Sequence, residues 1–342
     1  MSSESDIRAT AARLSIAAGR PPPLAFAPIS GGKNNRVYRL DYGDGVAPAA
    51  LKRYFVSKAD PRNRLATEWA FLTYARARGV DAVPSALAVE EETHSALYSF
   101  VPGRKLAPGE VGAREVGAAL DFIAAINSAP RAFAEMPAGS EACFAVGQHL
   151  ALIDRRVTRL EQQIGPDVPM RDEAMHFVRT MIFPAWETVR ARILRAAATG
   201  RINSDTALAP SEICLSPSDF GFHNALVRPD GKITFIDFEY AGRDDPAKLV
   251  CDFFCQPEVP VPLDLWRPFT EGVIARLDLS ARFRVVFDLL LDAYRLKWVC
   301  IILNEFVATD AARRGYAVGS DRITRCSAQL AKAQEKLAQV AL

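Results

Sequence analysis

The spacing of hydrophobic positions changes along the chain, and the first hundred residues carry the alternating pattern of short strands. The runs LAFAPIS, RVYRLDY and PAALKRYF are β-favouring and are separated by the turn sequences GGKNN and GDG. This arrangement predicts an antiparallel meander over residues 24–55. Two further runs, PSALAVEEE and SALYSFV, predict two more strands before the turn at Pro102 and Gly103.

Two helices are predicted within this first part of the chain. The segment 5–19 repeats apolar residues at helical spacing and ends at a glycine. The segment 60–79 starts with Asp60, has Pro61 at the first helical position and ends at Gly79. Its apolar residues recur at helical spacing, at Leu65, Trp69, Leu72 and Ala75.

Beyond residue 102 most of the chain has helical periodicity. The segments 107–129, 141–165 and 172–200, and several after residue 245, repeat apolar residues every three or four positions. The exception is the stretch LSPSDFGFHNALVRPDGKITFIDFEYAG, which contains runs that alternate like strands. The composition therefore divides the chain near residue 102 into a small sheet with few helices and a mostly helical remainder.

Composition and charge narrow the classes of function. With 342 residues, 49% of them hydrophobic, the chain can bury a sizeable core. Its 42 Lys and Arg nearly balance its 40 Asp and Glu, and no basic run is interleaved with aromatic residues, so we expect no nucleic-acid partner. Of the six cysteines only Cys251 and Cys255 are close, at helical spacing, which argues against a zinc cluster. With no apolar run of membrane-spanning length and no apolar signal core, we expect a soluble protein of the reducing cytoplasm.

The stretch 215–242 is rich in polar residues for a segment that alternates like strands. Asp219 and Asn224 share one predicted tight loop, and the run ITFID then places Asp237 at the end of a strand. A loop carboxylate can accept a hydroxyl proton, while an amide and a second carboxylate can hold a divalent cation through oxygen. We expect Asp237 to be buried between Ile236 and Phe238, with its negative charge neutralised by the cation. Each residue alone is a common turn former, but together they suit phosphoryl transfer.

The first part of the chain contains what such a site needs for a nucleotide. The turn SGGKNN can place backbone N–H groups over phosphates, Lys52 on a predicted strand can reach those phosphates, and Glu68 in the next helix can hold Lys52. Each also has an ordinary structural explanation, as a hairpin turn, a solvated strand lysine and a glutamate at the edge of a helix's buried face. The order along the chain favours the functional interpretation.

This order of motifs resembles the aminoglycoside phosphotransferase and choline kinase family over about residues 24–256. The resemblance implies an α+β, bilobal protein-kinase-like fold, with a small antiparallel sheet lobe for the nucleotide (1–102) and a larger helical lobe with the catalytic loop and acceptor site (103–342). It implies ATP and Mg²⁺ as cofactors. It also implies phosphate transfer to a hydroxyl of a small molecule of the aminoglycoside, choline-like alcohol or sugar class.

The resemblance assigns the nucleotide-binding roles residue by residue. The covering loop includes Ser30, Gly31, Gly32 and Asn35. Lys52 is implied to bind the α- and β-phosphates, with Glu68 as its ion-pair partner. The linker at 98–102, with Ser99 and Val101, is implied to present backbone groups to adenine.

The same resemblance assigns the catalytic roles. Asp219 is implied to be the catalytic base, and Asn224 and Asp237 the magnesium ligands. Candidate substrate contacts follow in the same stretch and in later helices: His223, Glu239, Tyr240, Asp252, Trp298 and Glu305. Aromatic residues suit a quaternary ammonium and carboxylates suit an aminosugar, so both acceptor types stay open.

Three positions depart from the family pattern. The family usually writes the catalytic loop as His-Gly-Asp, whereas Pro217 and Ser218 precede Asp219 here, so the buttressing histidine is absent. His223 stands where the family commonly has glycine. Lys248 replaces an acid often found after the Asp-Pro pair, which points to an acceptor unlike the basic antibiotics.

Two other functions are compatible with parts of the sequence. The missing histidine allows a nucleotide-binding regulatory module with weakened catalysis, although the other motifs are intact. A metal-dependent hydrolase using Asp219, His223 and Asp237 explains the polar stretch but leaves Lys52 and Glu68 without a role.

Overall fold

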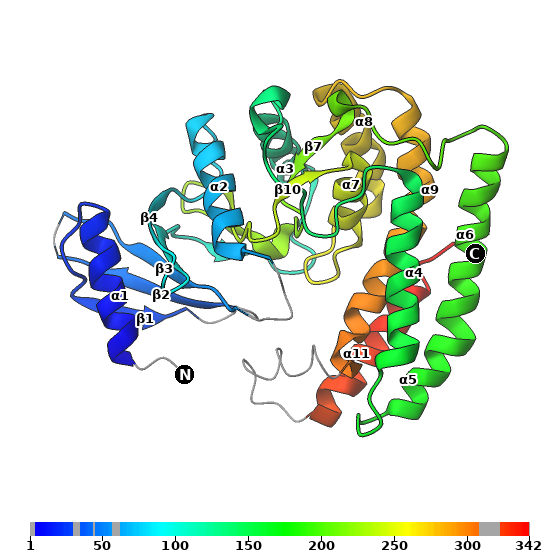
Figure 1. Cartoon of the computed structure of the whole chain (residues 1–342), viewed down its shortest axis with the longest axis horizontal. Coiled ribbons are helices and arrows are strands. Elements are labelled where there is room, and N and C mark those ends of the chain that lie inside the picture. Colours follow the sequence, from blue (N-terminus) through cyan, green and yellow to red (C-terminus); the bar gives the residue numbers. More distant parts are fainter. Residues whose placement is uncertain (1–3, 30–34, 44, 57–61, 308–321, 342) are drawn as a thin grey trace.

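The smaller of two lobes is built on a five-stranded antiparallel sheet, as the computed structural model shows (Figure 1). The model describes residues 4–29, 35–43, 45–56, 62–307 and 322–341. The strand order is β1-β2-β3-β5-β4. The strands all fall within the predicted runs: β1 (Ala25–Pro28), β2 (Arg36–Asp41), β3 (Ala49–Arg53), β4 (Ala86–Glu90) and β5 (Ser95–Ser99).

Two helices cover this sheet from opposite faces. Helix α1 (Glu4–Ala17) packs its buried Leu14 in a cluster with Leu51 of β3 and Leu97 of β5. Because successive strand residues point to opposite faces, Lys52, next to Leu51, turns toward helix α2 (Arg64–Ala77). The sheet therefore delivers Lys52 to the side that faces the helical lobe.

Helix α2 starts later than its sequence suggested. It begins at Arg64, and the side chain of Asn63 caps it by accepting from the backbone N–H of Ala66 at 3.0 Å. The described residues 62 and 63 precede the helix, and the predicted start at Asp60 and Pro61 lies outside the described residues.

Two small β-ribbons position the polar stretch of the larger lobe. Strand β7 (Cys214–Ser216) pairs with β10 (Gly242–Asp244), with Ser216 opposite Gly242. Strands β8 (Ala225–Val227) and β9 (Ile233–Phe235) form the predicted hairpin, and β6 (Arg104–Lys105) adds to its edge. The residues between these strands are thereby brought to one edge of the lobe, next to the sheet of the smaller lobe.

Helices make up most of the rest of the larger lobe (Figure 1). They are α3 (Ala113–Ile126), α4 (Val146–Gln163), α5 (Arg171–Phe177), α6 (Phe183–Ala198), α7 (Pro246–Cys255), α8 (Trp266–Arg276), α9 (Arg282–Ile302) and α11 (Arg322–Leu337). The segment predicted as one helix at 172–200 is two, joined by the π-helical turn Val178–Ile182 ahead of Pro184. A proline interferes with the hydrogen bonds of the preceding turn, which explains the break.

Within the described ranges no helix combines the length and the apolar character needed to cross a bilayer. The six cysteines are buried and free, and Cys251 and Cys255 lie on α7 at the predicted helical spacing.

Candidate active site

Lys52 is the centre of a buried ion cluster between β3 and α2. Its Nζ donates to Glu68 Oε2 and to Asp237 Oδ1, both at 2.5 Å. Burial alone lowers the pKa of Lys52, but the carboxylates of Asp237, Glu68 and Glu239 outweigh it and raise that pKa well above its ordinary value. Lys52 is therefore a permanent buried cation and not a solvated strand residue.

The Glu68 carboxylate is held on both oxygens. The Tyr54 hydroxyl donates to Oε2 at 2.7 Å, and the backbone N–H of Phe238 donates to Oε1 at 3.2 Å. The hydroxyl oxygens of Tyr54 and Tyr98 lie 2.6 Å apart. Glu68 is thus buried and oriented, and does not lie at the solvated edge of α2.

Asp237 follows β9 in a conformation that the sequence did not reveal. Its φ of 69° lies in the left-handed region, and its side chain is 40% exposed. The prediction that this carboxylate is buried between Ile236 and Phe238 was therefore wrong. The left-handed turn takes the chain out of its strand direction and leaves the Asp237 carboxylate at an open surface beside Lys52.

The buried carboxylate of this segment is Glu239. Its Oε1 accepts from Arg64 Nη1 at 3.1 Å, and its Oε2 accepts from Asn35 Nδ2 at 2.5 Å. Asn35 in turn accepts from the backbone N–H of Phe55 at 3.1 Å. Glu239 therefore links α2 to the start of β2. Sequence reasoning missed Arg64, although its position one turn before Glu68 placed both on one helix face.

Asp219 lies in the loop between β7 and β8. The loop passes through Ser218 at a φ of 64°, and the backbone N–H of Ser218 donates to Ser216 Oγ at 3.0 Å. Asn224 Nδ2 donates to the backbone carbonyl of Asp219 at 3.0 Å and to its carboxylate at 3.4 Å. Burial raises the pKa of Asp219, but His223, Asn224 and the nearby Lys297 outweigh it and lower that pKa. The Asp219 carboxylate is ionised and able to accept a proton.

His223 braces this carboxylate from the following turn. Its Nε2 lies 3.3 Å from Asp219 Oδ1. Gly221 makes the position possible, since a Cβ added there would lie 2.8 Å from His223 Nδ1. The loop without His at position 217 therefore has a histidine against its aspartate, supplied from four residues downstream.

Packing of aromatic side chains in the core fixes the loop between β7 and β8. Phe220 stacks on Phe253 of α7, with ring centroids 5.0 Å apart, and Phe222 lies 6.3 Å from Phe235 of β9. Both loop phenylalanines are buried. Because these side chains alternate with Asp219, Gly221 and His223, burying them turns the polar residues toward the opposite side.

The polar residues of both lobes face one cleft of about 890 Å³. Of the predicted site residues, twelve line it: Asn35, Lys52, Glu68, Ser99, Val101, Asp219, His223, Asn224, Asp237, Tyr240, Asp252 and Trp298. Glu239 and Glu305 are not among the lining residues, and Glu305 pairs instead with Arg325 at 3.1 Å. Ser30, Gly31 and Gly32 lie outside the described residues. A cleft of this size accommodates a nucleotide together with a small acceptor.

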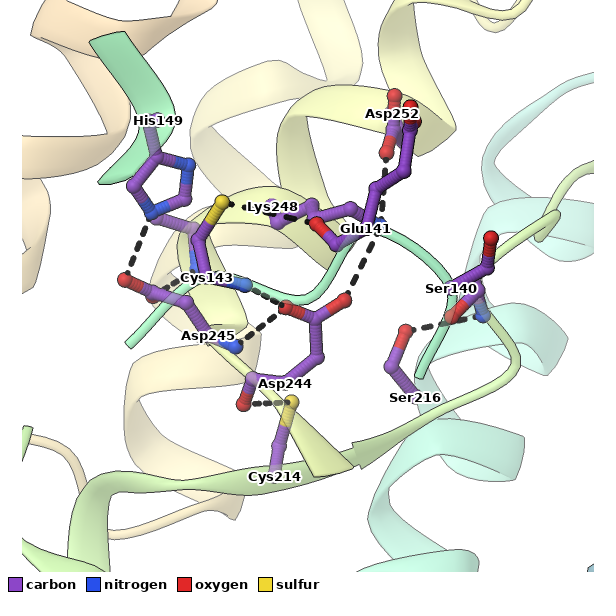
Figure 2. Close-up of polar contacts among 12 residues, drawn as sticks. Ser140, Glu141, Cys143, His149, Cys214, Ser216, Asp244, Asp245, Lys248 and Asp252 are labelled. Carbon is purple, nitrogen blue, oxygen red and sulfur yellow. Dashed lines mark hydrogen bonds and ion pairs between the residues drawn. The ribbon is translucent and has the colours of Figure 1, made fainter. Parts of the chain in front are cut away.

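A second buried ion cluster lies at the helical end of the cleft, and Figure 2 shows its residues Asp244, Lys248 and Asp252. Asp252 of α7 accepts from Lys297 Nζ on both carboxylate oxygens at 2.8 Å, and from Trp298 Nε1 at 2.9 Å. Lys248 Nζ lies 3.0 Å from Asp244 Oδ2 and 3.4 Å from Asp252 Oδ2. Of this cluster only Asp252, Trp298 and Lys248 were noted from the sequence, because partners from α7 and α9 are far apart in the chain.

The donors near Asp219 suit a hard divalent cation. The backbone N–H of Ile236 donates to the Asn224 carbonyl at 2.9 Å, which brings Asn224 beside Asp237. With Asn224 Nδ2 engaged by Asp219, its Oδ1 and the Asp237 carboxylate are oxygen donors of the kind Mg²⁺ prefers. Across the described part of the chain, no group of three or more His, Cys, Asp or Glu side chains could hold a metal ion. A cation at Asn224 and Asp237 would therefore complete its ligands with phosphate and water oxygens.

Several solved structures share this fold. The amicoumacin kinase hAmiN, in complex with AMP-PNP, Ca²⁺ and Ami, matches with a TM-score of 0.59 and 11% identity, over 99% of this chain and 94% of that one. The choline kinase LicA from Streptococcus pneumoniae matches with a TM-score of 0.57 and 14% identity, over 98% of each chain. The AMP-bound spectinomycin phosphotransferase APH(9)-Ia matches with a TM-score of 0.59 and 10% identity, over 94% of this chain and 98% of that one. At these identities the likeness establishes the fold, and the predicted protein-kinase-like architecture is confirmed.

No curated protein sequence matches the chain significantly. The family model APH, described as the phosphotransferase enzyme family, matches residues 25–255, which is more than half of the 342-residue chain. The matched range contains the Lys52 cluster, the Asp219 loop and Asp237. The chain therefore belongs to the phosphotransferase enzyme family.

Proposed function

We propose that this protein transfers the γ-phosphoryl group of ATP, in the presence of Mg²⁺, to a hydroxyl group of a small molecule. The observation that carries the proposal is the convergence of Lys52, Asp219, Asn224 and Asp237 on one cleft. A buried lysine suits phosphate oxygens, two oxygen donors suit Mg²⁺, and an ionised loop carboxylate suits a hydroxyl proton. The names of the structural relatives, which are kinases of amicoumacin, choline and spectinomycin, agree with an acceptor of low molecular mass.

The transfer requires one proton acceptor and one set of phosphate ligands. The acceptor's hydroxyl oxygen forms a bond to the γ-phosphorus while the bond from that phosphorus to the bridging oxygen breaks. ADP leaves with the electrons of the broken bond, and the hydroxyl proton goes to the Asp219 carboxylate. Asn224 and His223 hold that carboxylate in one orientation. Asn224 Oδ1 and Asp237 would hold Mg²⁺, which would supply charge neutralisation for the phosphates.

The Lys52 cluster is arranged to exchange partners when a nucleotide binds. Glu68 and Lys52 are almost fully buried, so this pair stays together and keeps the ammonium oriented. Asp237 is far more exposed, so its carboxylate can turn to a cation while Lys52 turns to the phosphates. The cluster is therefore a preformed phosphate site with one exchangeable ligand.

The linker after β5 has one backbone donor suited to adenine. The N–H groups of Ser99 and Phe100 already donate to the carbonyls of Ser85 at 2.9 Å and Pro48 at 3.3 Å. The N–H of Val101 has no partner within the described ranges, and Val101 lines the cleft. We assign the adenine contact to Val101 N–H.

The proposal is tested by replacing the base. Asp219→Ala should lower turnover by about 10²- to 10⁴-fold, since that is the usual contribution of a positioned proton acceptor. The measurement is ADP release, with the matching mass gain of one phosphate, from ATP, Mg²⁺ and pooled alcohols, sugars, aminoglycosides and choline-like compounds. ATP binding, followed by thermal shift, should be retained.

The matched control is Asp230→Ala, an exposed aspartate in the turn of the β8–β9 hairpin. It should keep the parent's turnover. Equal turnover in Asp219→Ala and the parent would show that Asp219 is not the base. ATP binding by the parent with no transfer to any pool would favour the regulatory nucleotide-binding module.

A further inference from the structure

Two buried tyrosines lie on the face of the small sheet that carries Lys52. Tyr54 follows β3 directly, and its backbone N–H continues the strand ladder by donating to the His94 carbonyl at 2.9 Å. Tyr98 lies on β5 opposite Ala50 of β3. Because alternate residues and cross-strand partners share one face of a sheet, both tyrosines face α2 together with Lys52. Only 5% of Tyr54 and 4% of Tyr98 is exposed, so both hydroxyls are enclosed there.

The number of hydrogens fixes the direction of the contact between the two hydroxyls. A tyrosine hydroxyl has one hydrogen, and that of Tyr54 goes to Glu68 Oε2 at 2.7 Å. The hydroxyl oxygens of Tyr54 and Tyr98 are 2.6 Å apart, so Tyr98 is the donor between them. Burial and the charge of Glu68 raise the pKa of each tyrosine, and both hydroxyls therefore keep their hydrogen. The result is one chain, in which Tyr98 donates to Tyr54 and Tyr54 donates to Glu68.

Tyr54 contacts both partners of the buried ion pair. Glu68 Oε2 accepts from the Tyr54 hydroxyl and from Lys52 Nζ. The same ammonium lies 4.9 Å from the centre of the Tyr54 ring. The donor to the other oxygen of Glu68 is the backbone N–H of Phe238, which belongs to the larger lobe. Tyr54 therefore ties α2 to β3 at the ion pair through contacts made within the smaller lobe.

The proposed exchange of partners at Lys52 increases the importance of Glu68. When Asp237 turns to a cation, Glu68 is the carboxylate that still holds the ammonium. A second donor at the oxygen that accepts from Lys52 limits rotation of the Glu68 carboxylate, and so limits the directions in which the ammonium can point. A charge held in one direction before the reaction is worth more than one that must be ordered during it.

We propose that Tyr54 and Tyr98 are positioning residues of the phosphotransfer site, which hold Glu68 and through it direct the Lys52 ammonium to the nucleotide phosphates. This inference rests on the proposed function and adds two residues to it. Tyr54 is not among the described residues that line the cleft, whereas Tyr98 lines it and directly precedes the linker residue Ser99. The chain therefore connects the linker assigned to adenine with the lysine assigned to the phosphates.

Tyr54→Phe tests the proposal because it keeps the ring and removes only the hydroxyl. Calorimetric titration of the full chain with a non-hydrolysable ATP analogue and Mg²⁺, and separately with adenosine, measures what the phosphates add to binding. The variant should bind the analogue about 3- to 10-fold more weakly than the parent, as for one lost hydrogen bond, and adenosine equally well. Turnover in the ADP-release assay should fall by about 10-fold, since the lysine is no longer held in place.

The matched control is Tyr74→Phe. Tyr74 lies on α2, and its hydroxyl donates to the Ile126 carbonyl at 3.0 Å, so the same group is removed from the same helix. This variant should keep the parent's turnover and its preference for the ATP analogue over adenosine. A Tyr54 hydroxyl with a structural role alone would lower stability in urea and leave both quantities unchanged, and that result would overturn the inference.

Tyr98 should act through Tyr54. Alone, Tyr98→Phe should lower turnover by about 2-fold, because it removes the outer bond of the chain and leaves the bond to Glu68 in place. Added to Tyr54→Phe, it should cause no further loss. An equal further loss in the double variant would show that Tyr98 acts independently and would contradict the chain. If Tyr54→Phe does not fold, the double variant, which also removes the Tyr98 hydroxyl left without its acceptor, replaces it in the same assays.

The two proposals fail in different ways. If the parent prefers the ATP analogue to adenosine but phosphorylates no compound, phosphate transfer is wrong, and a lower preference in Tyr54→Phe still supports the chain. If Asp219-dependent transfer occurs and Tyr54→Phe matches the parent in turnover and in preference, the chain is wrong while the proposed function stands. A parent with no preference for the ATP analogue contradicts both. Retained binding of adenosine shows that each variant is folded.

Discussion

The two buried lysine clusters beside the cleft are alike in composition and differ in the exposure of their carboxylates. In the first, Lys52 binds Glu68, whose side chain is 5% exposed, and also Asp237, whose side chain is 40% exposed. In the second, Lys248 lies between Asp244 and Asp252, whose side chains are 0% and 4% exposed. A partly exposed carboxylate can exchange its lysine for a cation from solution, whereas a fully enclosed one cannot leave its lysine without a large desolvation cost.

This difference in exposure suits the Lys52 cluster to ligand binding and the Lys248 cluster to holding the helices of the larger lobe together. The first joins β3, α2 and the residues after β9, and it opens to the cleft through Asp237. The second ties α7 to α9 through Asp252 and Lys297. The proposed function assigns the chemistry to the cluster with one exposed partner. The two clusters can be compared by removing each lysine.

Removing Lys52 should have the largest effect on activity. Lys52→Met takes away the cation assigned to the phosphates, and we expect turnover to fall by about 10²- to 10³-fold, as for loss of one preorganised charge. The free energy of unfolding should fall less than in the Lys248 variant below, because water and Mg²⁺ can reach Asp237 and the buried Glu68 keeps its hydrogen bonds from Tyr54 and Phe238. Steady-state turnover and urea unfolding measure the two effects. The comparison of clusters fails if this variant is the less stable of the two.

Removing Lys248 should act chiefly on stability. Lys248→Met leaves Asp244 buried without its cation, and the free energy of unfolding should fall by about 3–5 kcal/mol. Urea unfolding measures the loss, and affinity for an ATP analogue should stay near that of the parent. The matched double variant, Asp244→Asn with Lys248→Met, removes both charges and should recover most of the lost stability. A double variant as unstable as the single one would mean that the Asp244 charge is not the cause.

The sequence predicts those strands and helices whose position follows from the local spacing of apolar residues. The five strands and most helices follow from the spacing of apolar residues, since a strand or helix with one buried face needs that spacing. The start of α2 at Arg64 and the π-helical turn at Val178–Ile182 do not follow, because they depend on which cap and which helix packing is the more favourable. The position of a helix start and the presence of a π-helical turn depend on small differences in free energy between alternative local conformations. The pattern of apolar and polar residues does not reveal those differences.

The residues of the candidate site also fall into two groups: those that the sequence could identify and those that it could not. Lys52, Glu68, Asp219, Asn224 and Asp237 could be picked out because each follows a recognisable strand, helix or turn. The pairs Arg64–Glu239 and Lys297–Asp252 join residues 175 and 45 positions apart, so no local signal marks them. The exposure of Asp237 was mispredicted because its left-handed φ has no marker such as glycine in the sequence.

A buried histidine next to the second cluster makes the stability of this region depend on pH. His149 of α4 is fully buried, with Nδ1 2.6 Å from the Tyr294 hydroxyl and Nε2 3.0 Å from Asp245 Oδ2. Figure 2 shows Asp245 next to Asp244 of the second cluster. Burial lowers the pKa of His149, but hydrogen bonds to Asp245 and Cys143 outweigh it and raise that pKa to about 10. The imidazolium is therefore part of the charged scaffold at neutral pH.

Because the pKa of His149 rises from 6.5 on folding, its stabilisation is complete below pH 6.5 and is lost as the pH rises to about 10. The free energy of unfolding should fall across this window, with His149 contributing at most about 1.4 kcal/mol per pH unit. His149→Gln should remove that part of the slope, while His176→Gln, at an exposed position on α5, should keep it. Urea unfolding at several pH values makes the measurement. The same slope in His149→Gln and the parent would show that this scaffold does not depend on an imidazolium, and that lysine alone supplies its positive charge.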